Sequence, residues 1–174
     1  LFRSSIGLPN GRSYQFTYNT NGYLDRLTFP SGAYIRYTYI DYDYPYAPDP
    51  IGWFVASRIV SADGTAGAEK TWTYSYPQTT EGPGNVITTV TDPTGARTVH
   101  FVGNSGSDVR TEYRSSSDEI LKVVTPSYGG SGNALLGTVI SAQATWLGGF
   151  ESSKALTYDS HNKDRKSTRL NSSH

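Results

Sequence analysis

The 174-residue sequence contains no cysteine, which excludes disulfide bonds and thiol chemistry and fits a secreted or surface protein without excluding a cytosolic one. It also has no methionine and begins at Leu1, so we expect an internal fragment. No apolar run approaches the roughly 18 residues of a membrane helix, so no membrane span is predicted. The 15 basic and 15 acidic residues balance, and without a basic stripe nothing predicts nucleic-acid binding.

Helical periodicity is also missing, whereas residues typical of strands and turns are abundant. The chain has 14 Tyr, 6 Phe and 3 Trp for strands, and 18 Gly and 9 Pro for turns. Aromatic and hydroxyl-bearing residues alternate in Ser13–Tyr18 and again in Thr71–Tyr76, so each strand has an aromatic face and a polar face. The sequence therefore predicts an all-β protein, an antiparallel meander of repeated β-hairpins.

A short signature recurs along the chain: a glycine, four residues, then an aromatic residue, threonine and tyrosine. The first two copies lie 21 residues apart, a repeat length that suits one β-hairpin, and hairpins of this kind bury their faces by stacking on their neighbours. The copies are Gly11 with Phe16 and Tyr18, Gly32 with Tyr37 and Tyr39, Gly67 with Trp72 and Tyr74, and a degraded copy at Leu156, Thr157 and Tyr158.

Three Pro-x-Gly turns accompany the signature, and together these motifs resemble the YD repeats of RHS proteins, which are bacterial relatives of the teneurins and of toxin-complex shell subunits. The resemblance covers residues 8–102 well and residues 103–150 in patches. The matching segments are Pro9-Asn10-Gly11, Asn21-Gly22-Tyr23-Leu24, Pro30-Ser31-Gly32, Pro93-Thr94-Gly95 and Tyr158-Asp159.

The resemblance implies a β-spiral that forms part of the wall of a hollow shell, with no catalysis of its own. The parent protein would be secreted or displayed by a bacterium, and the partners of this segment would be neighbouring repeats and an encapsulated C-terminal toxin domain. The alternative is a carbohydrate- or protein-binding adhesin, in which an exposed aromatic strip contacts glycans. Because large aromatic side chains are mostly buried, packing is the favoured role for the aromatic residues.

Residues 164–174 break from this composition and read as a translated sequencing-library adapter. We therefore expect the native repeat region to span residues 1–163, with 12 basic and 14 acidic residues and a formal charge of −2, and the tail to be disordered. The proline-rich segment 42–50 is predicted to be an insertion loop. Strands are expected at 12–18, 23–29, 33–40, 54–61, 69–76, 86–92, 96–102, 108–114, 119–125, 136–145 and 152–158.

No motif predicts a catalytic residue, a metal site or a cofactor site. Asp41 and Asp43 lack the glycine and glutamate of a calcium loop, and Gly132–Gly137 lacks the Lys-Ser/Thr of a phosphate loop. His100 follows Gly95 at the signature's aromatic position, so we expect it to replace a packing ring. His161 has no recognisable partner, and no Gly-x-Ser-x-Gly nucleophile elbow occurs.

Overall fold

The computed structural model describes residues 4–41, 52–77, 86–103, 107–128, 139–158 and 164–172. The chain divides into two compact units, unit 1 (Leu1–Tyr74) and unit 2 (Ser75–His174). Both consist of antiparallel strands joined in chain order, apart from one short 3₁₀ helix, η1 (Ala66–Ala68). The predicted all-β hairpin meander is thus confirmed. In the part of the chain that the structure describes, no helix could span a membrane.

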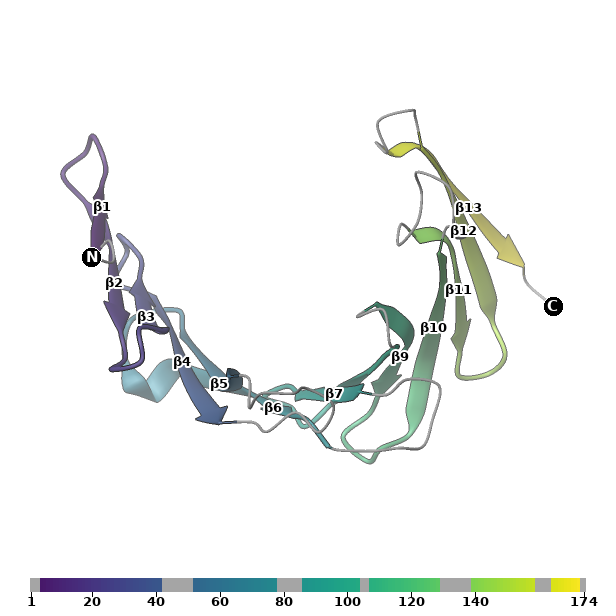
Figure 1. The fold of residues 1–174 in the computed structure, drawn as a ribbon, viewed down its shortest axis with the longest axis horizontal. Coiled ribbons are helices and arrows are strands. Elements are labelled where there is room, and N and C mark those ends of the chain that lie inside the picture. Colours follow the sequence, from purple (N-terminus) through teal and green to yellow (C-terminus); the bar gives the residue numbers. More distant parts are fainter. Residues whose placement is uncertain are drawn as a thin grey trace. The chain divides into compact units, whose positions relative to one another are not determined.

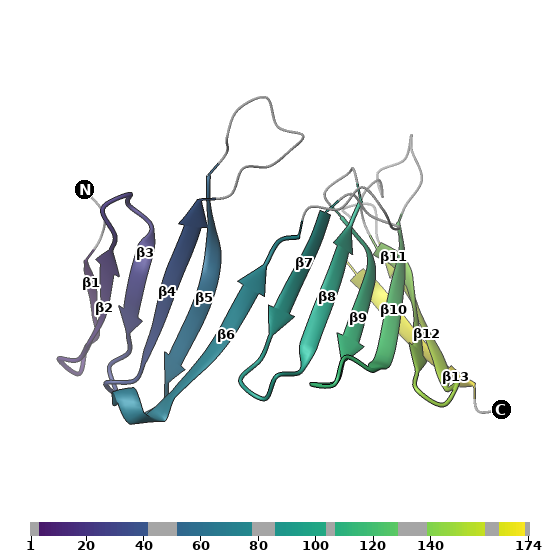
Figure 2. The ribbon, with the colours of Figure 1, turned by 90° about the horizontal axis from the view of Figure 1, so that it is seen from below.

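Unit 1 contains six strands, and consecutive strands pair antiparallel from β1 to β6 (Figures 1 and 2). Five of them match predicted strands to within about two residues, and the short first strand was not predicted. The strands are β1 (Ser5–Gly7), β2 (Ser13–Tyr18), β3 (Leu24–Thr28), β4 (Tyr34–Asp41), β5 (Trp53–Ser61) and β6 (Glu69–Ser75).

Unit 2 continues the same antiparallel pattern with seven strands. The last of them occupies residues that the sequence predicts to be disordered. The strands are β7 (Val86–Thr91), β8 (Arg97–Val102), β9 (Asp108–Arg114), β10 (Ile120–Tyr128), β11 (Val139–Trp146), β12 (Glu151–Tyr158) and β13 (Asp164–Ser172).

One pair of backbone hydrogen bonds recurs in the turns at six places. In each turn the fourth residue donates its amide to the carbonyl of the first, and the first donates its own amide to the carbonyl of the fifth. The fourth residue has a positive φ, between 70° and 91°. In five of the turns this is a type I turn followed by a left-handed bulge residue. The turn that begins at Trp146 differs, because its third residue, Gly148, also has a positive φ of 92°, which a type I turn does not have. The six turns begin at Leu8, Asn19, Phe29, Asp92, Ser115 and Trp146.

Side chains reinforce these turns from within. Asn19 Oδ1 accepts hydrogen bonds from the amides of Asn21 and Tyr23, and Asp92 Oδ1 accepts them from the amides of Thr94 and Ala96. Such side-chain acceptors replace backbone partners that the turn leaves unpaired. Proline at the second position of three turns fixes a φ that this geometry requires.

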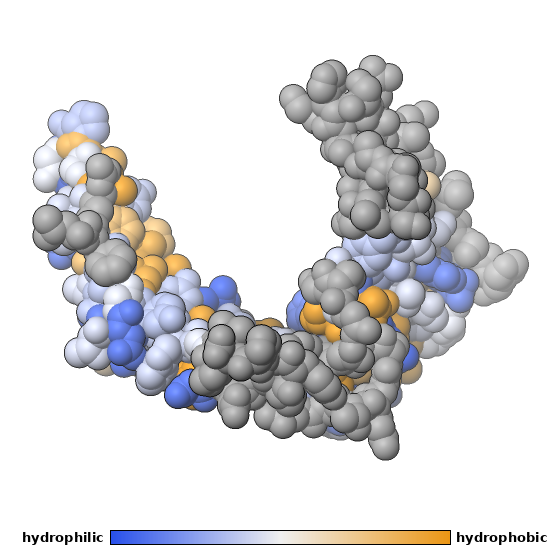
Figure 3. Space-filling model, in the orientation of Figure 1, coloured by the Kyte–Doolittle hydropathy of each residue, from blue (hydrophilic) through white to orange (hydrophobic). Residues whose placement is uncertain are grey.

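Burial within the sheets is shallow. The buried apolar residues in the described chain are Tyr34, Ile59 and Val99, and most other strand residues are half-buried. In the space-filling view, apolar side chains of unit 1 remain visible at its surface (Figure 3). The aromatic residues of β2 and β6 are half-buried and the residues between them exposed, which confirms the predicted alternation.

Gly67 of the signature lies in η1, and the turn between β5 and β6 holds Gly64, whose φ is +84°. One sequence-based expectation differs from the structure. Residues 164–172 form β13 beside β12, although disorder was predicted. The open backbone groups of β12 explain this pairing, because a sheet edge accepts a following chain largely irrespective of its side chains. The segments 42–50 and 132–137 and the residues Asp159 and His161 lie outside the described residues.

Candidate functional site

The aromatic signature forms a cross-strand row in unit 1. Tyr37 on β4 lies opposite Arg58 on β5, and Arg58 lies opposite Trp72 on β6. The Arg58 guanidinium carbon is 4.5 Å from the centre of the Trp72 ring, a cation–π contact. The two signature aromatics therefore flank one arginine and do not form an unoccupied strip.

The other signature residues occupy related positions but not one continuous row. Phe16 on β2 lies opposite Leu27, which lies opposite Ile35, so its row is two residues away from that of Tyr37. The Tyr39 hydroxyl donates to the Leu24 carbonyl at 2.7 Å, and burial raises the pKa of Tyr39 above its usual value. Tyr18, Tyr74 and Tyr158 lie at or next to the ends of β2, β6 and β12. Gly11, Gly22, Gly32 and Gly95 are turn residues with positive φ.

The most buried cluster of unit 1 lies on the opposite, polar face. Tyr34 is only 4% exposed, and its hydroxyl donates to Glu69 Oε1 at 2.5 Å. That hydrogen bond raises the pKa of Tyr34 above its usual value. Arg36 pairs with the same carboxylate at 3.4 Å, and the Arg26 guanidinium carbon lies 3.7 Å from the Tyr34 ring centre. The alternation of aromatic and polar residues within single strands did not predict this cluster, because its members come together only through the register of β3 to β6.

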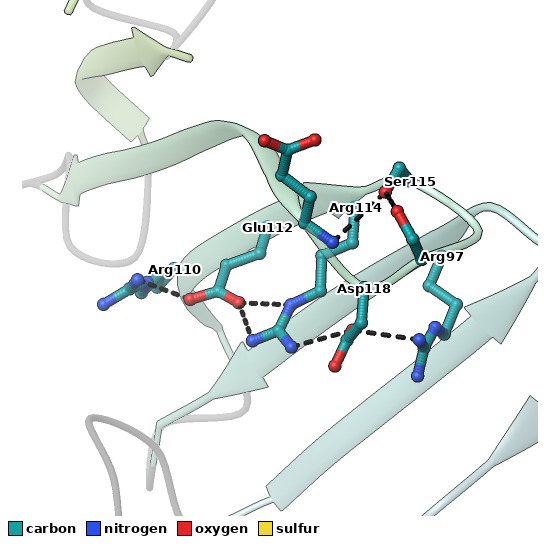
Figure 4. A network of polar contacts seen from close by, with 8 residues as sticks. Arg97, Arg110, Glu112, Arg114, Ser115 and Asp118 are labelled. Atoms are coloured by element: carbon teal, nitrogen blue, oxygen red, sulfur yellow. Dashed lines mark hydrogen bonds and ion pairs between the residues drawn. The ribbon is translucent and has the colours of Figure 1, made fainter. Parts of the chain in front are cut away.

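Unit 2 holds a buried carboxylate between arginines (Figure 4). Glu112 on β9 is 3% exposed, and both Arg110 and Arg114 donate to its carboxylate. Arg114 also reaches Asp118 at 2.9 Å, and Arg97 reaches Asp118 at 3.1 Å. The hydrogen bond from Arg114 lowers the pKa of Asp118. The arginines neutralise a charge that would otherwise be costly to bury, so the network stabilises β8 and β9.

Asp118 has a φ of 70° and is the only non-glycine residue with a positive φ in the described chain. It occupies the bulge position that glycine holds in the other five repeated turns. Its ion pairs with Arg97 and Arg114 offset the cost of this conformation.

His100 is half-buried in β8, and its Nδ1 lies 2.9 Å from Asp108 Oδ2. The sequence did not predict this pairing, because the repeat alignment predicts that His100 replaces a packing aromatic ring. The aromatic residue that meets an arginine here is its neighbour Phe101, 5.7 Å from the Arg110 guanidinium carbon. The Thr111 hydroxyl donates to the same Asp108 carboxylate at 3.5 Å, so the three side chains form a small cross-strand polar contact.

A shallow hollow of about 400 Å³ lies over β10 to β12 in unit 2. Its lining includes the aromatic ring of Trp146 and the ammonium groups of Lys122 and Lys154, with small side chains between them. Lys122 Nζ lies 4.8 Å from the Trp146 ring centre and 5.2 Å from that of Tyr113. Sequence reasoning did not select this site, because its residues come from three strands and match no motif.

Within the described ranges no three His, Asp or Glu side chains gather into a group that could hold a metal ion. Comparison with known proteins finds no protein family and no curated protein that matches this chain.

Proposed function

We propose that this chain is a structural segment of a hairpin-repeat wall, of the kind that its YD-like motifs imply, and that it has no chemistry of its own. The observation that carries the proposal is the recurrence of one pair of turn hydrogen bonds at six places along the chain. Repeats of one small unit that contact mainly their neighbours are typical of extended structural arrays.

The contacts of the aromatic residues support packing over binding. Three arginines lie over aromatic rings on neighbouring strands, and each has a buried Nε atom without a hydrogen-bond partner in the described chain. These arginines contribute to packing against the rings. The pairs are Arg26 with Tyr34, Arg58 with Trp72 and Arg110 with Phe101. Of these rings, Trp72 belongs to the signature, and its contact with Arg58 favours a packing role for it over a sugar-binding role.

The wider setting follows from the resemblance alone. The wall would belong to a large bacterial RHS-type protein that is secreted, displayed at the surface or delivered as a toxin. Its partners would be further repeats of the same chain and an enclosed C-terminal toxin domain.

Replacing Trp72 by alanine tests the structural role. Trp72 is half-buried against Arg58, so its loss removes part of a buried ring and a cation–π contact. We expect the free energy of unfolding to fall by about 1.5–3 kcal/mol. Urea unfolding followed by circular dichroism measures this change. The control is Thr73→Ala, because Thr73 is exposed on the opposite face.

A Trp72→Ala protein that unfolds like the parent but loses retention on a glycan array would support the adhesin instead. A Thr73→Ala protein as unstable as Trp72→Ala would also contradict the proposal, since the two faces would then be equivalent.

A further inference from the structure

We infer that the hollow over β10 to β12 of unit 2 binds an acidic oligosaccharide. The inference is separate from the wall proposal, because it uses none of the signature residues of unit 1. It rests on three features of the hollow: an aromatic ring, two lysines for which the described residues supply no acidic partner, and a floor of small side chains.

The register of the strands places these features on one face. Lys122 lies opposite Trp146, Val124 lies opposite Ala144, and Ala144 lies opposite Ser152. Ala142 lies opposite Lys154, two residues further along the strands. Small side chains therefore separate an aromatic and cationic end from a second cationic end.

The dimensions of this face suit an extended ligand. Along the strand direction, the row of Lys154 lies four residues from the row of Lys122. Across the sheet, the two residues lie on β12 and β10, which are separated by β11. Standard sheet spacings put their Cα atoms about 13 Å apart in the first direction and about 10 Å in the second. A short oligosaccharide spans this distance, whereas a single small anion does not.

The charges of the hollow select an anionic ligand. No acidic side chain is among the lining residues that the structure describes. Neither lysine has a carboxylate within ion-pair distance in the described ranges. Both ammonium groups are thus available to carboxylates of a ligand, with which they form charge-assisted hydrogen bonds.

The ring and the hydroxyl favour a sugar over other anions. Trp146 is half-buried and presents an amphipathic ring at the surface of the hollow, next to the Lys122 ammonium. A pyranose bearing a carboxylate satisfies both groups at once, with its apolar face on the ring and its charge at the lysine. Ser152, between the two ends, supplies a hydroxyl for the sugar hydroxyls.

Isothermal titration of the full chain with tetragalacturonate tests the inference, with the fully methyl-esterified tetrasaccharide as the uncharged ligand. We expect saturable binding of the acid, at least about tenfold weaker binding of the ester, and weakening by added salt. Lys122→Gln with Lys154→Gln should weaken binding of the acid about tenfold, and Trp146→Ala should do so to a similar extent. Lys70→Gln, which removes an exposed lysine from unit 1, should leave binding unchanged.

Three results would overturn the inference: no saturable binding of tetragalacturonate, equal binding of acid and ester, or a lysine double variant that binds like Lys70→Gln. Inorganic tetraphosphate separates a saccharide site from a general polyanion surface. If it binds as well as tetragalacturonate, and Trp146→Ala affects neither ligand, the saccharide proposal fails. The lysine variants keep the test valid even if Trp146→Ala does not fold, and melting curves of all variants show which of them do.

Discussion

At the scale of single residues, the turns of this chain require a left-handed backbone conformation at one position. Glycine adopts this conformation without strain in most turns, and side-chain ion pairs offset the strain where the residue is Asp118. Gly64 has a φ of +84°, and a Cβ atom there would lie 2.6 Å from the Gly32 carbonyl oxygen. Two turns of unit 1 therefore approach each other through backbone atoms alone. Gly11 has a similar φ of +77°, but a Cβ atom there would meet nothing within 4 Å.

These two glycines make a matched pair of tests. Gly64→Ala should lower the free energy of unfolding by about 2–4 kcal/mol, because it combines left-handed strain with a clash against backbone. Gly11→Ala should cost only about 1–2 kcal/mol, the strain alone. Chemical unfolding of both variants measures the difference. Equal losses would show that Gly64 and the Gly32 carbonyl are not in close contact.

At the scale of elements, carboxylates as well as backbone atoms hold two of the turns, one of the repeated turns at Asp92 and the turn at Asp63. Hydrogen bonds from Thr94 lower the pKa of Asp92, and hydrogen bonds from Thr65 lower that of Asp63. A lowered folded pKa means that the ionised form is preferred in the folded state. Its contribution to stability is complete above the usual aspartate range near 4 and is lost as the pH falls through the folded pKa.

Acidification should therefore weaken the turns. We expect the melting temperature to fall between pH 5 and pH 3, and to fall less steeply in Asp92→Asn, because asparagine keeps the Oδ1 acceptor but does not titrate. Melting curves across this range, beside a control of Asp25→Asn on β3, check the prediction. An Asp92→Asn protein with the full acid sensitivity of the parent would contradict it.

Local sequence predicted elements better than it predicted their contacts. Pro-x-Gly and Asn-Gly fix turn geometry within four residues, so the turns at Pro9, Pro30 and Pro93 and the strands between them were predicted correctly. The turn that ends at Asp118 carries no glycine, and its strain is offset by Arg97 and Arg114, which local patterns do not reveal.

Register explains the contacts that were missed. Alternation marked the face of Phe16 and Trp72 as the packed one, whereas the buried residues of unit 1, Tyr34, Ile59 and Ser61, lie on the other face. The placement of Arg58 between Tyr37 and Trp72 depends on the pairing of three strands, which no single strand specifies. The hollow at Trp146 has the same origin. The adapter origin of residues 164–174 stays a prediction.

At the scale of the whole molecule, both units are built from hairpins that share one pattern of turn hydrogen bonds, with little apolar core among the described residues. Stability then comes mainly from strand pairing and from contacts between neighbouring strands, such as the arginine–aromatic pairs and the Glu112 network. Such contacts suit a repeat wall of the proposed kind, because each hairpin in it is stabilised mainly by its neighbours.

Amide hydrogen exchange followed by nuclear magnetic resonance tests the central claim, that one hairpin is repeated along both units. The account predicts that the bulge-position amides of all six turns exchange at least about tenfold more slowly than in an unstructured peptide, since each donates to the carbonyl three residues before it. Free-peptide exchange at the turns of either unit would contradict the account, because the repeat would then be absent from that part of the chain. The amides to follow are those of Gly11, Gly22, Gly32, Gly95, Asp118 and Gly149.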